Sequence, residues 1–126
     1  MTVVKVVDAS ALAALLFGEP EAAAMAERLM GARLAAPSLL HYEVANIFLT
    51  KSRRHPEQGD ALRAAFGLLS RLPVSPVAID PSPMLDLAEA TGLTAYDASY
   101  LSLAHSLGAE LVTLDRKLAA AFASTI

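Results

Sequence analysis

The segment VVKVVDASALAALLF, residues 3–17, decides the fold class. It opens with a short β-branched run, typical of a strand buried on both faces, and continues into an alanine- and leucine-rich segment that favours a helix. A single acid, Asp8, stands at the junction between the two. A strand that leads directly into a helix is typical of βαβ units, in which helices connect parallel strands.

The rest of the chain repeats this alternation. Short apolar runs predict three more strands, at residues 33–37, 74–79 and 110–114, and Pro76 places the second of these at a sheet edge because proline lacks an amide hydrogen. Further helices are predicted at residues 22–30, 39–54 with Ser38 as N-cap, 56–72, 83–90, 94–107 and 116–123. We therefore expect an α/β fold, a three-layer α/β/α sandwich with a mostly parallel central sheet, forming a single domain over residues 1–126.

Composition narrows the functional classes. Hydrophobic residues make up 55% of the 126 residues and charged residues only 18%, which excludes intrinsic disorder. No apolar stretch reaches the roughly 18 residues that span a bilayer, and Asp8 stands where a signal peptide would need basic residues, so we expect a cytoplasmic protein without a membrane partner. The absence of cysteine excludes thiolate nucleophiles, zinc–thiolate sites and iron–sulfur clusters. The net charge of −3 provides no overall cationic field for nucleic acid.

Two acids are predicted to meet at one rim of the sheet. Asp8 follows the first strand and Asp115 follows the last, and in open α/β sheets ligands bind beyond the carboxyl ends of the strands. Ser10 and Thr113, each two residues from one of these acids, add hydroxyl oxygens at the same end. Each acid by itself would also suit a helix N-cap, so this alternative stays open.

Two further acids occupy helices. Glu43 interrupts an apolar helical segment, with Asn46 on the same face, and burying its carboxylate needs a compensating partner that the local sequence does not provide. A solvent-facing position for Glu43 is the alternative. Asp97 stands near the start of its helix, where the helix dipole would also favour a negative charge.

A convergence of these four carboxylates would require a cation. Acids on one rim repel one another unless hard divalent ions neutralise them, and oxygen ligands without cysteine favour Mg²⁺ or Mn²⁺. The chemistry typical of such a site is attack of metal-activated water on a phosphodiester. By contrast, Asp80 lies in the turn signature Asp80-Pro81-Ser82-Pro83 and is predicted to be a turn or cap residue.

Basic residues follow two of these acids along the chain. Lys51, Arg53 and Arg54 end the Glu43 helix, and Arg116 and Lys117 directly follow Asp115. All five are candidate phosphate contacts that would offset the repulsion between an acidic site and RNA. For the first three, ordinary charges at a helix C-terminus are the alternative.

The chain resembles the PIN-domain ribonucleases, and among them the VapC-type toxins of bacterial toxin–antitoxin pairs. The resemblance rests on Val6-Val7-Asp8-Ala9-Ser10, on the helix with Glu43 and Asn46, on Tyr96-Asp97-Ala98, and on Leu111-Val112-Thr113-Leu114-Asp115-Arg116. These segments occur in the family's order over nearly the whole chain. One departure is the C-terminus, where a final edge strand would be reduced to Ser124-Thr125-Ile126.

The resemblance implies an Mg²⁺- or Mn²⁺-dependent endoribonuclease that cuts transfer or ribosomal RNA. It implies that the catalytic, metal-binding residues are Asp8, Glu43, Asp97 and Asp115, with Ser10, Asn46 and Thr113 as supporting polar residues. It also implies a homodimer held inactive by a VapB-like antitoxin whose tail blocks the acidic pocket. The alternative from another class is a catalytically silent α/β module that binds RNA or protein without cutting.

Overall fold

A computed structural model describes residues 2–125 and contains one four-stranded sheet with the order β3-β2-β1-β4. The strands are β1 (Val4–Val7), β2 (Arg33–Pro37), β3 (Val74–Val77) and β4 (Glu110–Val112). Every pairing is parallel, and Val6 of β1 lies opposite Ala35 on one side and Leu111 on the other. Because parallel neighbours need crossover connections, helices lie between successive strands, which confirms the predicted α/β class.

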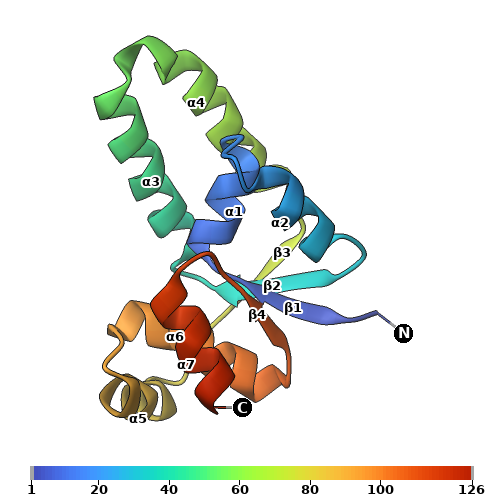
Figure 1. The fold of residues 1–126 in the computed structure, drawn as a ribbon, viewed down its shortest axis with the longest axis vertical. Coiled ribbons are helices and arrows are strands. Elements are labelled where there is room, and N and C mark those ends of the chain that lie inside the picture. Colours follow the sequence, from blue (N-terminus) through green and yellow to red (C-terminus); the bar gives the residue numbers. More distant parts are fainter. Residues whose placement is uncertain (1, 126) are drawn as a thin grey trace.

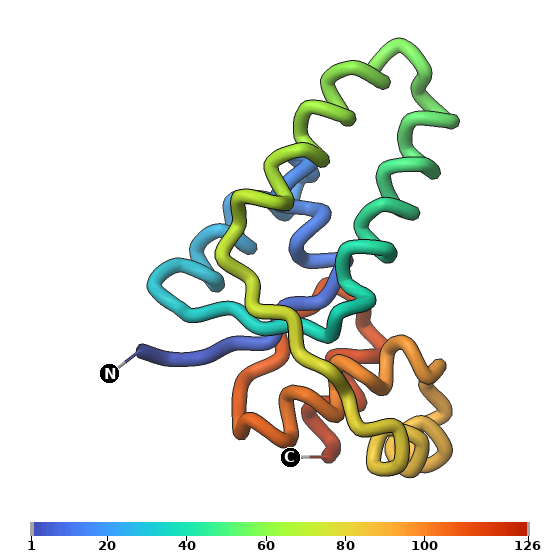
Figure 2. The backbone as a smooth tube through the Cα atoms, turned by 180° about the vertical axis from the view of Figure 1, so that it is seen from behind, coloured from blue at the N-terminus to red at the C-terminus, as the bar shows by residue number. Residues whose placement is uncertain are grey.

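Helices cover both faces of this sheet (Figure 1). One layer contains α1 (Ala9–Leu16), α2 (Ala22–Leu29), α3 (Leu40–Arg54) and α4 (Gly59–Gly67), and the other contains α5 (Pro81–Thr91), α6 (Ala95–Leu107) and α7 (Arg116–Thr125). The helices α3 and α4 form a hairpin that projects beyond the sheet. Figure 2 shows β3 from behind, running from this hairpin towards α5.

The interior strand β1 explains the apolar run that opens the chain. Val6 and Val7 of β1 are fully buried, since β1 has a neighbour on each edge and a helical layer on each face. Leu12 of α1 and Leu101 of α6 are also fully buried and belong to the same core. The predicted position of Pro76 on an edge strand is confirmed, because within residues 2–125 β3 pairs with β2 alone.

Two predictions about helices are wrong in detail. The segment 56–72 is not one helix: α4 is flanked by the short 3₁₀ helices Pro56–Gln58 and Leu68–Arg71, where the chain tightens before β3. Ser38 is not an N-cap, because it lies in a turn and Leu39 precedes the first residue of α3 without a side-chain cap. Asp80 does cap α5, as predicted: the Ser82 amide donates to its Oδ1 at 3.1 Å.

Two strand predictions also change. The last strand ends at Val112 rather than at residue 114, because the Leu114 amide donates to Ser10 Oγ at 3.0 Å instead of continuing the ladder. No final edge strand forms at Ser124-Thr125, since both residues belong to α7, and Ile126 lies outside the described residues. Within residues 2–125, no helix has the length and apolar character needed to cross a membrane.

Candidate active site

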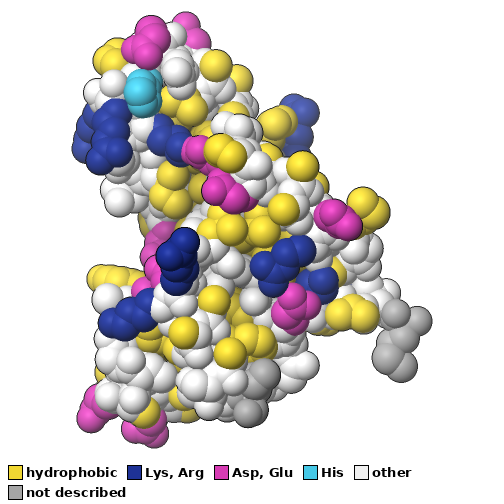
Figure 3. Space-filling view, viewed as in Figure 1, with side chains coloured by type: hydrophobic (Ala, Val, Ile, Leu, Met, Phe, Trp, Pro, Cys, Tyr) yellow, Lys and Arg dark blue, Asp and Glu magenta, His cyan; other side chains and the backbone are white. Residues whose placement is uncertain are grey.

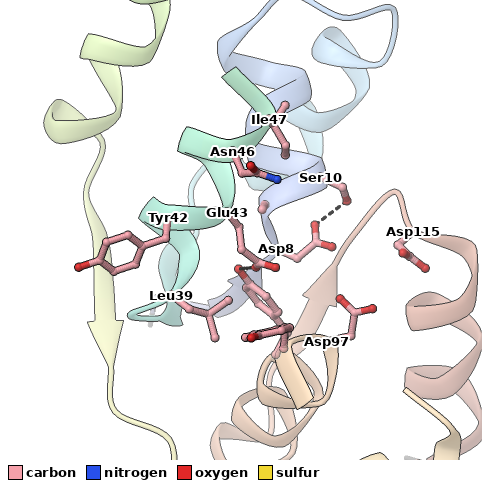
Figure 4. A pocket seen from close by; sticks show the side chains of 12 residues that line it. Asp8, Ser10, Leu39, Tyr42, Glu43, Asn46, Ile47, Asp97 and Asp115 are labelled. Carbon is pink, nitrogen blue, oxygen red and sulfur yellow. Dashed lines mark hydrogen bonds between the residues drawn. The ribbon is translucent and has the colours of Figure 1, made fainter. Parts of the chain in front are cut away.

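A pocket of about 590 Å³ opens beyond the carboxyl end of β1, between α3 and α6. Its lining brings together all four acids singled out in the sequence, here called the acidic cluster: Asp8, Glu43, Asp97 and Asp115. Figure 4 shows Glu43 on α3 and Asp97 on α6 facing the region around Asp8, which lies between β1 and α1, while Asp115 lies just before α7. Ser10 and Asn46 also line the pocket, whereas Thr113 reaches it through its hydrogen bond to Asp8.

Asp8 is held from three directions. Its Oδ1 accepts from the Ala11 amide at 3.0 Å and from Ser10 Oγ at 2.7 Å, and its Oδ2 accepts from Thr113 Oγ1 at 2.5 Å. The carboxylate is therefore both the N-cap of α1 and a fixed, 5% exposed group at the floor of the pocket. Asp8 is thus a helix N-cap and also an acid of the pocket, so the two alternatives raised by the sequence are compatible.

Asp97 and Asp115 are placed by helix starts. Thr94 caps α6 by accepting from the Asp97 amide at 3.1 Å, so Asp97 lies in the first helical turn. Asp115 accepts from the Leu118 amide at 3.0 Å at the start of α7. These contacts place both residues at helix N-termini beside the same pocket, where negative charge is also favoured.

Glu43 has a partner that the sequence analysis missed. The Tyr100 hydroxyl donates to Glu43 Oε1 at 2.5 Å, and Tyr100 itself is only 1% exposed. The compensation that the local sequence lacks thus comes from α6, one helical turn after Asp97. The sequence spacing could have pointed to Tyr100. It stands three positions after Asp97, and residues three apart share a helix face.

The electrostatics of the pocket reflect burial first and crowding of like charges second. Burial is the main cause that raises the pKa of Asp8, and the nearby Asp115 raises it further, against three hydrogen bonds that lower it. Burial likewise raises the pKa of Glu43, opposed by the Tyr100 hydrogen bond and reinforced by Asp97 and Asp8. Burial and Asp115 raise the pKa of Asp97, while Lys117 lowers it. The carboxylates therefore destabilise one another's ionised forms.

This donor set fits a hard divalent cation. The pocket combines carboxylate and hydroxyl oxygens, and a cation would favour the ionised forms that burial and mutual repulsion disfavour. Among residues 2–125, no three acidic or histidine side chains are arranged to hold one ion together. Mg²⁺ typically takes one or two protein carboxylates and keeps several waters.

The predicted basic residues fall into two separate places. Lys51 pairs with Glu19, and Arg53 and Arg54 lie in the last turn of α3, where Figure 3 shows Lys and Arg side chains gathered at the far end of the hairpin. Ten residues of helix separate Arg53 from Glu43, or about 15 Å. The second group is closer to the acids.

Lys117 belongs to this closer group, at the start of α7. Its Nζ donates to the Gly92 carbonyl at 3.0 Å, and its charge lowers the Asp97 pKa. Arg116 is its exposed neighbour. Figure 3 shows a second set of basic side chains beside acidic ones near the start of α7. Of the predicted basic residues, this pair is therefore better placed for a phosphate at the pocket.

Comparisons with known proteins agree in sequence and in fold. A family model described as PIN domain matches residues 5–122. Ribonuclease VapC3 of Pyrobaculum aerophilum is 37% identical over 96% of each chain, and Ribonuclease VapC9 of Mycobacterium tuberculosis is 35% identical over 90% of this chain and 87% of its own.

Solved structures give the same result. The crystal structure of PAE2754 from Pyrobaculum aerophilum superposes with a TM-score of 0.75 and 34% identity, covering 100% of this chain and 90% of that one. VapC20 of Mycobacterium tuberculosis, described as a sarcin-ricin loop cleaving toxin, has a TM-score of 0.64 at 17% identity, with 94% of each chain covered. At that identity the second likeness supports the fold alone.

Proposed function

Because this chain belongs to the PIN-domain family, and within it to the VapC-type ribonuclease toxins, we propose that it hydrolyses RNA phosphodiester bonds in a reaction that depends on Mg²⁺ or Mn²⁺. The observation that supports the metal dependence most directly is the acidic cluster itself. Four carboxylates from separate parts of the chain share one pocket, and three of them have pKa values raised by burial and by other acids of the cluster. Such a cluster is stabilised by a divalent cation.

Each residue of the site has a distinct task in this proposal. Carboxylates of the acidic cluster would hold the cation, one or two of them directly and the others through its waters, and the bound cation would supply Lewis-acid polarisation of the phosphodiester and activation of a water. Ser10 and Thr113 hold the Asp8 carboxylate in place through its two oxygens. Tyr100 does the same for Glu43, while Asn46, one helical turn after Glu43, presents an amide to the pocket.

RNA also needs cationic contacts beside these acids. Lys117 and Arg116 are the first candidates, because Lys117 already acts on the Asp97 carboxyl, and Arg53 and Arg54 would contact a more distant part of a long substrate. We further propose transfer or ribosomal RNA as substrate, a cytoplasmic location, a homodimer and inhibition by a VapB-like antitoxin. These proposals rest on the family, whose VapC members this chain matches over most of its length.

Cleavage of total transfer and ribosomal RNA by the purified, antitoxin-free protein tests the activity. Discrete fragments should form with Mg²⁺ or Mn²⁺ and disappear with EDTA or in the Asp97→Asn variant. Asp60→Asn, the same change at an exposed residue of α4 outside the pocket, should cut like the wild type. Binding of these RNAs without cleavage at any metal concentration, by a folded sample, would favour the silent RNA-binding module instead.

A further inference from the structure

The three tyrosines of this chain gather in one place. All of them, Tyr42, Tyr96 and Tyr100, line the pocket that contains the acidic cluster. The four phenylalanines instead pack against the hydrophobic core or lie within it: Phe17, Phe48, Phe66 and Phe122. Aromatic rings that carry a hydroxyl group are thus concentrated at the pocket of the acidic cluster.

Tyr42 and Tyr96 differ from Tyr100 in exposure. Tyr100 is buried and bonded to Glu43, whereas the side chains of Tyr42 and Tyr96 are 80% and 65% exposed. Core packing therefore does not account for these two rings. Burial of an aromatic side chain is strongly favourable, so two rings left in water beside a pocket are available to a ligand.

Helix geometry explains how the two rings come to lie at the rim. Each directly precedes an acid of the cluster, Tyr42 before Glu43 on α3 and Tyr96 before Asp97 on α6. Consecutive helical residues are rotated by about 100°, so an acid that faces into the pocket leaves the preceding ring at its edge. Figure 4 shows the Tyr42 ring extending outward on the side away from Asp115.

Basic residues also lie near the pocket, and Lys117 acts on Asp97, the neighbour of Tyr96. The basic residues Arg116 and Lys117 lie beyond Asp115 at the start of α7, and the tyrosines lie on α3 and α6. A nucleic acid strand offers phosphates to cations and base faces to aromatic rings. Unpaired bases can stack on such rings, whereas the interior bases of a duplex are already stacked on both faces.

We propose that Tyr42 and Tyr96 are base-stacking residues that position unpaired RNA nucleotides next to the acidic cluster, an inference that rests on the proposed ribonuclease function. Stacking requires the rings and not the hydroxyls. Each ring therefore contributes to binding of single strands, and neither contributes to binding of a fully paired duplex.

Binding of a fluorescein-labelled, unstructured 12-nucleotide RNA tests this, measured by anisotropy with Ca²⁺ replacing Mg²⁺ and with the RNA checked for integrity afterwards. Tyr42→Ala and Tyr96→Ala should each raise the Kd about 5- to 150-fold, the range of about 1–3 kcal/mol per stacked base at about 1.4 kcal/mol per tenfold. Tyr42→Phe, Tyr96→Phe and the control Leu85→Ala, a half-exposed side chain on α5, should bind within twofold of the wild type.

The same RNA annealed to its complement serves as the control. It distinguishes loss of base stacking from a general loss of RNA binding. Alanine variants that lose duplex and single-strand binding equally, or that bind the single strand like the wild type, overturn the role of the tyrosines. If the wild type still cuts RNA with Mg²⁺ in those cases, the proposed function stands without this inference. A wild type that neither binds nor cuts RNA refutes the proposed function and this inference with it.

Discussion

Removing one hydroxyl from the pocket, with Tyr100→Phe, gives a quantitative test of how Glu43 is held. The ring stays in place because Tyr100 is only 1% exposed, so the change removes the 2.5 Å hydrogen bond and little else. A hydrogen bond to a charged group contributes about 1.5–3 kcal/mol. Glu43 is half-buried and lines an open pocket, so a water can replace part of the lost hydrogen bond. We therefore expect the free energy of unfolding to fall by about 1–2 kcal/mol at pH 7.

Urea unfolding followed by circular dichroism measures this loss, which corresponds to a Tm lower by about 4 °C per kcal/mol for a chain of this size. The hydrogen bond lowers the Glu43 pKa, so the variant should raise that pKa further, and the loss of stability should shrink as the pH falls through it. In a Glu43→Gln background the same change should cost about half as much, because a neutral acceptor bonds about half as strongly. An equal loss in both backgrounds, or no loss in either, would refute this account of Glu43.

Three further predictions concern other parts of the molecule. Burial raises the Asp8 pKa, so the contribution of the protonated carboxyl to stability is present below about pH 4 and lost as the pH rises through the folded-state pKa. As the pH rises from 4 to 7 in EDTA, the unfolding free energy of Asp8→Asn should therefore increase relative to that of the wild type. A difference in unfolding free energy, measured with urea, that stays the same over this pH range would contradict this. Leu12→Ala, at a fully buried position, should cost about 2–5 kcal/mol in the same assay, against less than about 1 kcal/mol for the half-exposed Leu85→Ala. Replacing Arg53 and Arg54 together with alanine should lower the slope of log Kd against log salt for RNA by up to about 2, and an unchanged slope would show that the end of α3 does not contact phosphates.

Several features of the fold follow from local sequence. The β-branched run at 3–7 and the segment after it predicted a buried strand and a helix, and β1 proved to be an interior strand of the sheet. Pro76 predicted an edge strand because its missing amide hydrogen cannot join a ladder on both sides. The placement of Asp8 and Asp115 also followed from local order, since each acid comes just after a parallel strand and such strands end at one rim.

The tertiary structure alone decided which distant side chains meet. Tyr100 is 57 residues from the Glu43 that it binds, and Thr113 is 105 residues from Asp8. The end of β4 depends on Ser10, whose hydroxyl accepts the Leu114 amide across the chain. Periodicity and turn chemistry act between near neighbours and can be recognised in a sequence, whereas these contacts exist only after the sheet has brought its strand ends together.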